Sequence, residues 1–223
     1  MLGKPVLTDG GFAPRQLQIG DVMAGADFIP ATIATAANLP ITGVMLLGKY
    51  ILRNPAAISN ENIDTAANLL AAFVAASAVP SPSSTGRIQD GTSFIVRWIL
   101  TTANALTVVG AANTGVTVTR GTVAASTSKD FLVTIRNGTP AQTFAGVTVN
   151  ASAVVTLTVA QASVLTPGMI VTNAVAGLQG TTIIGVNIQA GTVTMSGNAN
   201  ANNPLPGVAI SFSPVVLVEG LAG

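Results

Sequence analysis

The chain has 223 residues, of which 49% are hydrophobic and only 8% are charged, and it contains neither Cys nor His. A chain of this length holds one large domain or two smaller ones. Because Cys and His are missing, disulfides, thiolate nucleophiles and His-dependent catalytic or metal sites are excluded.

Charge and hydropathy argue against two further classes of protein. Nine basic and eight acidic residues give a net charge of +1, and the basic residues never form a run, so we expect no nucleic-acid binding. The mean hydropathy is +0.62. The longest apolar stretch, residues 65–79, spans about 15 residues where a membrane helix needs about 20. We therefore expect no membrane insertion, and the N-terminus lacks the apolar core of a secretory signal.

The first predicted unit is an N-terminal arm. Residues 1–40 contain Pro and Gly clusters and no sustained hydrophobic period. They carry more large apolar side chains than a free tail would hold. We expect the arm to reach onto neighbouring subunits, with candidate inter-subunit contacts at Phe12, Leu17, Ile19, Phe28 and Ile29.

The next two segments carry different patterns. Residues 41–53, ITGVMLLGKYILR, are rich in Ile, Leu, Val and Tyr and end at Asn-Pro, which predicts a strand followed by a turn. Apolar residues then recur at three-to-four spacing, which predicts a short helix near 64–77 with Asp64 as its N-cap and Pro80 after its end. A Pro- and Ser-rich loop follows over 79–91.

From residue 92 onward the hydrophobic period changes to two. Short β-branched runs such as TSFIVRWILT (92–101) and DFLVTIRNG (130–138) alternate with turn residues at a spacing of about ten, which is typical of an antiparallel β-sandwich or barrel. The last third repeats the pattern, ending in VVLVEGL (215–221). We predict a mainly β fold with one short helix and a second, small β-module.

The stretch PGMIVTNAVAGLQGTTIIGVNIQAGTVTMSGNANAN (167–202) contains no charged residue. In a strand with one dry and one wet face, Thr keeps the β-branched preference while its hydroxyl meets water, so a sheet can be soluble without ions. We therefore interpret this stretch as a neutral β-module that performs no acid, base or metal chemistry.

No catalytic motif emerges from the rest of the chain. The eight acidic residues are scattered singly, and no Gly-rich phosphate-binding motif lies between a strand and a helix. The segment SGNANANN (196–203) offers only neutral oxygens, which make a poor calcium site. The lone Trp98 is interpreted as a core or interface residue rather than a sugar-stacking one. We expect a protein that is not an enzyme and binds no cofactor or metal.

Several ordered motifs resemble virion proteins of tailed bacteriophages, especially capsid decoration or head-fibre-like proteins. They are ITGVMLLGKYILRNP, IDTAANLLAAF, and GTSFIVRWILTTANALTVVGAANTGVTVTRGTVAASTSKDFLVTIRN, and together they cover about half of the chain. The stretch at 167–202 resembles a small β-module inserted in or appended to virion and surface proteins. The resemblance implies a structural role in a virion.

The two resemblances together predict a discontinuous arrangement. In the first group, a strand similar to FLVTIRN (131–137) is soon followed by a closing strand, which PVVLVEGLAG (214–223) resembles here. We therefore expect a β-domain formed by residues 41–140 with 214–223, and a module formed by 141–213. The module is either inserted in a loop of that domain or simply the next domain in the chain.

These expectations give one functional hypothesis and two alternatives. The hypothesis is a cement protein on the outer capsid surface of the virion, with the major capsid protein as its partner and a dimer or trimer as its own assembly. The first alternative is a tail, baseplate or fibre component that contacts the host. The second is a bacterial surface adhesin domain that binds a glycan.

Overall fold

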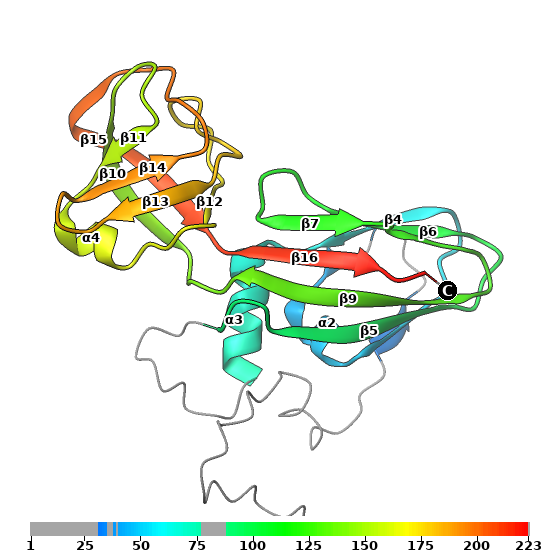
Figure 1. The fold of residues 1–223 in the computed structure, drawn as a ribbon. Helices are drawn as coiled ribbons and strands as arrows, with labels where there is room; N and C mark the ends of the chain where they lie inside the picture. The colour runs from blue at the N-terminus through cyan, green and yellow to red at the C-terminus, as the bar shows by residue number, and fades with distance from the viewer. Residues whose placement is uncertain (1–30, 35–37, 39, 77–87, 223) are drawn as a thin grey trace, which may run out of the picture.

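The computed structural model describes residues 31–34, 38, 40–76 and 88–222. It consists mainly of β-strands arranged in three sheets (Figure 1). The prediction of a mainly β chain is confirmed. The sheets do not close into a barrel, and two of them mix parallel and antiparallel pairs where the sequence pattern had predicted antiparallel strands alone.

The first sheet has six strands in the order β1-β3-β5-β9-β16-β7. Two pairs of neighbours are antiparallel: β5 with β9, and β9 with β16. The other three pairs, β1 with β3, β3 with β5 and β16 with β7, are parallel. Their bounds are β1 Ala31–Ala34, β3 Tyr50–Arg53, β5 Ser93–Leu100, β7 Val116–Thr119, β9 Ser128–Asn137 and β16 Val215–Gly220.

The second sheet has the order β2-β4-β6-β8, and its buried residues share one hydrophobic cluster with those of the first sheet. Its strand β4 alternates strictly: Ser59, Glu61 and Ile63 are buried, and Asn60 and Asn62 are exposed. This is the pattern of a sheet with one dry face and one wet face. The bounds are β2 Pro40–Ile41, β4 Ser59–Ile63, β6 Leu106–Gly110 and β8 Thr122–Val123.

Two helices pack together within this part of the fold. The helix α3, Ala66–Ala76, confirms the helix predicted near 64–77. Its cap is Thr65 rather than the predicted Asp64, because the Thr65 hydroxyl accepts the backbone N–H of Asn68. The carboxylate of Asp64 instead accepts the backbone N–H of Thr65 and the side-chain amide of Asn68.

The prediction of one strand over 41–53 is wrong. Thr42 caps a short helix there, α2 (Gly43–Leu47), by accepting the backbone N–H of Met45. The chain then turns through Lys49, whose φ is +62°, and the strand residues of this range are Ile41 at the end of β2 and the four residues of β3. A Cβ on Gly43 would lie 2.6 Å from the Cβ of Ala72, so the close approach of α2 to α3 requires glycine.

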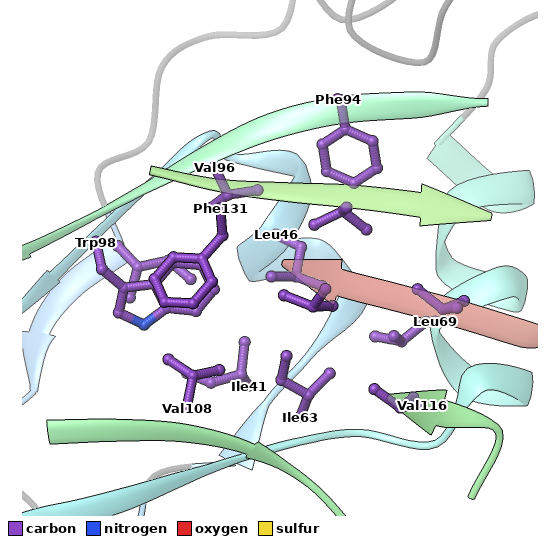
Figure 2. Packing of buried hydrophobic residues seen from close by; sticks show 14 of the residues in the cluster. Ile41, Leu46, Ile63, Leu69, Phe94, Val96, Trp98, Val108, Val116 and Phe131 are labelled. Carbon is purple, nitrogen blue, oxygen red and sulfur yellow. The ribbon is translucent and has the colours of Figure 1, made fainter. Parts of the chain in front are cut away.

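The core of this part lies between the first two sheets and the helices. Figure 2 shows Trp98 and Phe131 side by side near Ile41 and Val108, with Phe94 toward the other end of the core. The Trp98 and Phe131 rings lie 4.6 Å apart at 60°. Phe73 from α3 meets Phe94 edge to face at 5.4 Å. Such aromatic pairs add about 0.5–1.5 kcal/mol beyond the area they bury.

One ion pair is buried inside the same part. Arg53 on β3 and Glu61 on β4 are both 0% exposed and form a bidentate pair, with N–O distances of 3.0 and 2.5 Å. The hydroxyl of Ser59 donates to the same carboxylate at 3.1 Å. The pair therefore joins the first sheet to the second across the interior.

The third sheet is antiparallel throughout and draws all its strands from residues 142–213 (Figure 1). It has its own core, which includes Val155, Met169, Leu178, Ile210 and Phe212. A short helix, α4 (Val159–Ser163), follows its second strand and begins with a capping box formed by Thr158 and Gln161. The strand bounds are β10 Gln142–Thr148, β11 Val154–Thr156, β12 Ile170–Val171, β13 Ile183–Asn187, β14 Thr192–Met195 and β15 Asn203–Ser213.

The chain leaves the first sheet after β9 and returns to the same sheet at β16. β9 ends at Asn137, β16 begins at Val215, and these two residues are partners in the first sheet. All strands of the third sheet lie between them in sequence. This pairing is what an inserted module requires, and the division into an arm, a discontinuous β-domain and a module remains a prediction.

Polar contacts fix the junction between the two parts. The side-chain amide of Asn137, which is 1% exposed, donates to the Thr166 hydroxyl at 2.9 Å and to the Pro167 carbonyl at 2.8 Å. Its oxygen accepts the backbone N–H of Thr139. Next to it, the N–H of Gly138 donates to the Asp90 carboxylate at 2.8 Å.

Candidate interaction surface

The carboxylates that the structure describes are engaged separately from one another. Glu61 forms an ion pair with Arg53, and Asp130 forms one with Arg97. Asp64 accepts the backbone N–H of Thr65 just before α3, and Asp90 accepts the backbone N–H of Gly138. Glu219 lies 4.0 Å from Arg120. Among these residues no group of three acidic side chains could hold a metal ion. The remaining acids, Asp9, Asp21 and Asp27, lie outside the described ranges.

Trp98 is part of the core. It is 0% exposed, and its indole N–H has no hydrogen-bond partner among the described residues. A surface glycan therefore cannot stack on it without the sandwich opening.

The first sheet has a second face, turned away from the core, which we call the outer face. Along β5 the buried Val96 and Trp98 alternate with Ile95, Arg97 and Ile99. Because successive side chains point to opposite sides of a strand, the latter three lie on the outer face. The large apolar residues of the outer face are Tyr50, Leu52, Ile95, Ile99, Leu132 and Leu217.

Strand register brings several of these side chains together. Ile95 is opposite Leu132, and Leu52 is opposite Ile99. Residues directly opposite on one face have Cβ atoms about 4.5–5.5 Å apart. Ile95 is 50% exposed although it sits in the middle of a strand. The outer face thus carries apolar side chains in solvent at the centre of a sheet.

Ionic pairs lie among these apolar residues. Arg97 donates to both carboxylate oxygens of Asp130, at 2.6 and 2.8 Å, between the rows that contain Ile99 and Ile95. These hydrogen bonds hold the pKa of Asp130 below its ordinary value of 3.8 and raise the pKa of Arg97. Arg136 is exposed farther along β9, and Arg120 and Glu219 lie near the end of β16.

The faces of the other sheets differ in composition. The second sheet turns Asn60, Asn62, Thr107 and Thr122 outward. The third sheet has exposed or half-exposed Thr143, Thr156, Thr192 and Thr194, and it also exposes the apolar Val154, Ile184 and Leu205. No residue from Asn137 to Val218 is Lys, Arg, Asp or Glu. Apolar bulk and charge therefore occur together on the outer face. Exposed apolar patches rimmed by polar residues are one kind of surface at which proteins interact.

The arm residues predicted to make inter-subunit contacts, Phe12, Leu17, Ile19, Phe28 and Ile29, lie outside the described residues. The outer face was not predicted. The sequence did contain its signal: FIVRWIL has apolar residues in both phases of the strand period, which indicates a strand that buries one face and exposes apolar groups on the other.

No helix in the described ranges is long and apolar enough to cross a membrane. Comparisons of the chain with protein families, with characterised proteins and with solved structures gave no match.

Proposed function

We propose that this chain is a non-enzymatic virion structural protein of a tailed bacteriophage, which decorates and cements the outer surface of an icosahedral capsid. The observation that carries the proposal is the outer face of the first sheet, where half-exposed Ile95 and its apolar neighbours lie among ionic pairs. The resemblance to decoration proteins supports it, because its motifs fall on α2, β3, α3 and the strands from β5 to β9.

The outer face docks on the major capsid protein in this proposal. Burial of apolar surface contributes about 25 cal/mol per Å². Each contact is modest, but many symmetric copies act together, so the shell cannot rupture without breaking many of them. The uncharged module, residues 141–213, projects away from the shell, where its Thr-rich strands meet water.

Assembly of the protein with itself, as a dimer or trimer, is part of the same proposal. Sheets of low charge expose edges that other strands can pair with, and closed symmetry covers such edges. The described edge strands β12 and β13 carry no charged residue.

The test is binding of the purified protein to capsids that lack it. We expect hundreds of copies per particle by gel densitometry, density on the outer shell by cryo-electron microscopy, and a higher temperature of capsid rupture. Ile95→Asp should lower capsid occupancy about tenfold or more, since it places an unpaired charge in the contact.

The matched control is Val154→Asp on the third sheet, where Val154 is 41% exposed. It should leave occupancy unchanged. Copy numbers in the tens, located at the tail, would instead support the tail component. Binding on a glycan array without capsid binding would support the adhesin. Equal effects of the two Asp variants would remove the outer face as the docking surface.

A further inference from the structure

Helix α3 is apolar on both of its sides. Among Ala66–Ala76 the only polar residue is Asn68. One side, formed by Ala66, Leu69, Leu70 and Phe73, is buried in the core. A surface helix of a globular protein ordinarily turns charged or polar residues to solvent. The outward side of α3 has no charged residue and only Asn68 as a polar one, so most of it has the composition of a covered surface.

The outward side of α3 lines an apolar groove. Its floor and one wall come from Ala67, Leu70, Ala71, Val74 and Ala75, and the other wall comes from Pro140 and Ala141. The groove has a volume of about 450 Å³. No charged side chain lines it. It lies where the chain passes from the first sheet toward the third.

The size and lining of the groove indicate bulky apolar ligands. An apolar cavity of about 150 Å³ accommodates a benzene-sized group, so this groove has room for two or three such groups. Four of the seven lining residues are alanine, which leaves space above the helix rather than filling it. A ligand that fills the groove must therefore supply the large side chains itself.

We propose that the occupant is the N-terminal segment of this chain, residues 1–30. That segment contains Phe12, Leu17, Ile19, Phe28 and Ile29, which are the large apolar side chains the groove lacks. The other segment outside the described residues, 77–87, is SAVPSPSSTGR and offers mainly Ser and Pro. A second copy of α3 would place alanine against alanine and leave the groove unfilled.

Covalent linkage favours this occupant. The segment is joined to β1 at Ala31, and 30 residues can extend about 100 Å, which is ample to reach the groove of the same chain or of a neighbour. A tethered ligand is present at an effective concentration in the millimolar range, so modest contacts are enough to hold it.

Cysteine cross-linking tests the proposal, because the chain has no Cys of its own. The variant pair Ala71→Cys with Phe28→Cys is oxidised gently in purified full-length protein, and the products are analysed by non-reducing gel and peptide mass mapping. Ala71 is exposed, so the substitution leaves the core intact. The control pair is Val154→Cys with Phe28→Cys.

The expected result is cross-linking about tenfold faster or more for the Ala71→Cys pair than for the Val154→Cys pair. A link within one chain or between two chains supports the proposal, and the latter also shows that copies exchange segments. Equal rates for both pairs overturn it. Rapid disulfide dimerisation of Ala71→Cys alone, unaffected by removal of residues 1–30, also overturns it in favour of a second copy.

A second measurement does not depend on the choice of residue 28. Deletion of residues 1–30 should increase the fluorescence of the apolar dye anilinonaphthalene sulfonate, and Ala71→Phe in the deleted chain should reverse the increase by filling the groove. No change on deletion would contradict the proposal. Both measurements use the protein without capsids, so their failure leaves the capsid-binding proposal standing.

Discussion

At the scale of single residues, the buried pair of Arg53 and Glu61 joins the first sheet to the second inside an otherwise largely apolar core. Two charges at 0% exposure have lost their hydration, and the bidentate geometry with the Ser59 hydroxyl offsets that cost. The pair was not foreseen, since the sequence places the two residues on different strands and charged residues are almost always exposed.

Glu61→Gln should therefore destabilise the protein strongly, because it leaves the Arg53 guanidinium buried without a counter-ion. The expected loss in the free energy of unfolding is about 3–5 kcal/mol. The double variant Arg53→Met/Glu61→Leu should recover most of it, since no charge is left inside. Urea denaturation measures both. A single variant as stable as the parent would show that water reaches this site.

The surface pair of Arg97 and Asp130 leads to a prediction about pH. The pKa of Asp130 is lower in the folded chain than its ordinary value, so the ionised carboxylate stabilises the fold above the ordinary pKa. That contribution is lost as the pH falls through the lower folded pKa. The difference in urea midpoint between the parent and Asp130→Asn should shrink as the pH falls below the ordinary pKa of 3.8. A difference that grows on acidification would contradict the assignment.

At the scale of elements, helix α3 was predictable and its start was not. Three-to-four spacing of Leu and Phe gave its position, but both Asp64 and Thr65 are good capping residues. The choice depends on the preceding strand β4, which ends at Ile63, and on the Thr114 carbonyl, which accepts the N–H of Ala66. Helix α4 was missed although its capping box, Thr158 to Gln161, is visible in the sequence.

Thr65→Ala should cost about 1 kcal/mol of stability, because the backbone N–H of Asn68 loses its acceptor. Thr65→Ser keeps the hydroxyl and should be close to neutral. Thermal unfolding of the two variants gives the comparison. If Asp64→Ala were the more damaging change, the cap would lie one residue earlier than the hydrogen bonds indicate.

At the scale of the whole molecule, the mainly β class was predictable from period-two runs, but the parallel pairs were not. β3 and β5, or β4 and β6, lie far apart in sequence, and each pair becomes parallel only because the intervening chain crosses over. The period-two pattern of a strand does not show which other strand it pairs with, or in which direction. The outer face follows from the same arrangement, since it becomes a surface only when β5 and β9 lie side by side.

The insertion can be tested by excision. Replacing residues 141–213 with a short Gly-containing turn should leave a chain that unfolds cooperatively, because Asn137 and Val215 are already partners in the first sheet. Its urea midpoint should be lower than that of the parent, since the Asn137 amide loses Thr166 and Pro167. Circular dichroism and urea titration provide the measurements. Loss of cooperative unfolding would mean that the two parts fold as one unit.

The junction also contains a site of slow deamidation. Asn137 precedes Gly138, and this dipeptide deamidates when the glycine nitrogen attacks the asparagine side chain to form a succinimide. Here the glycine nitrogen is held by Asp90, and the asparagine amide is held by Thr166 and Pro167. Attack must wait until these bonds open together. The rate of deamidation at Asn137 therefore reports how often the junction opens. Each deamidation converts Asn137 into an acidic residue and so places a negative charge in a stretch that has none.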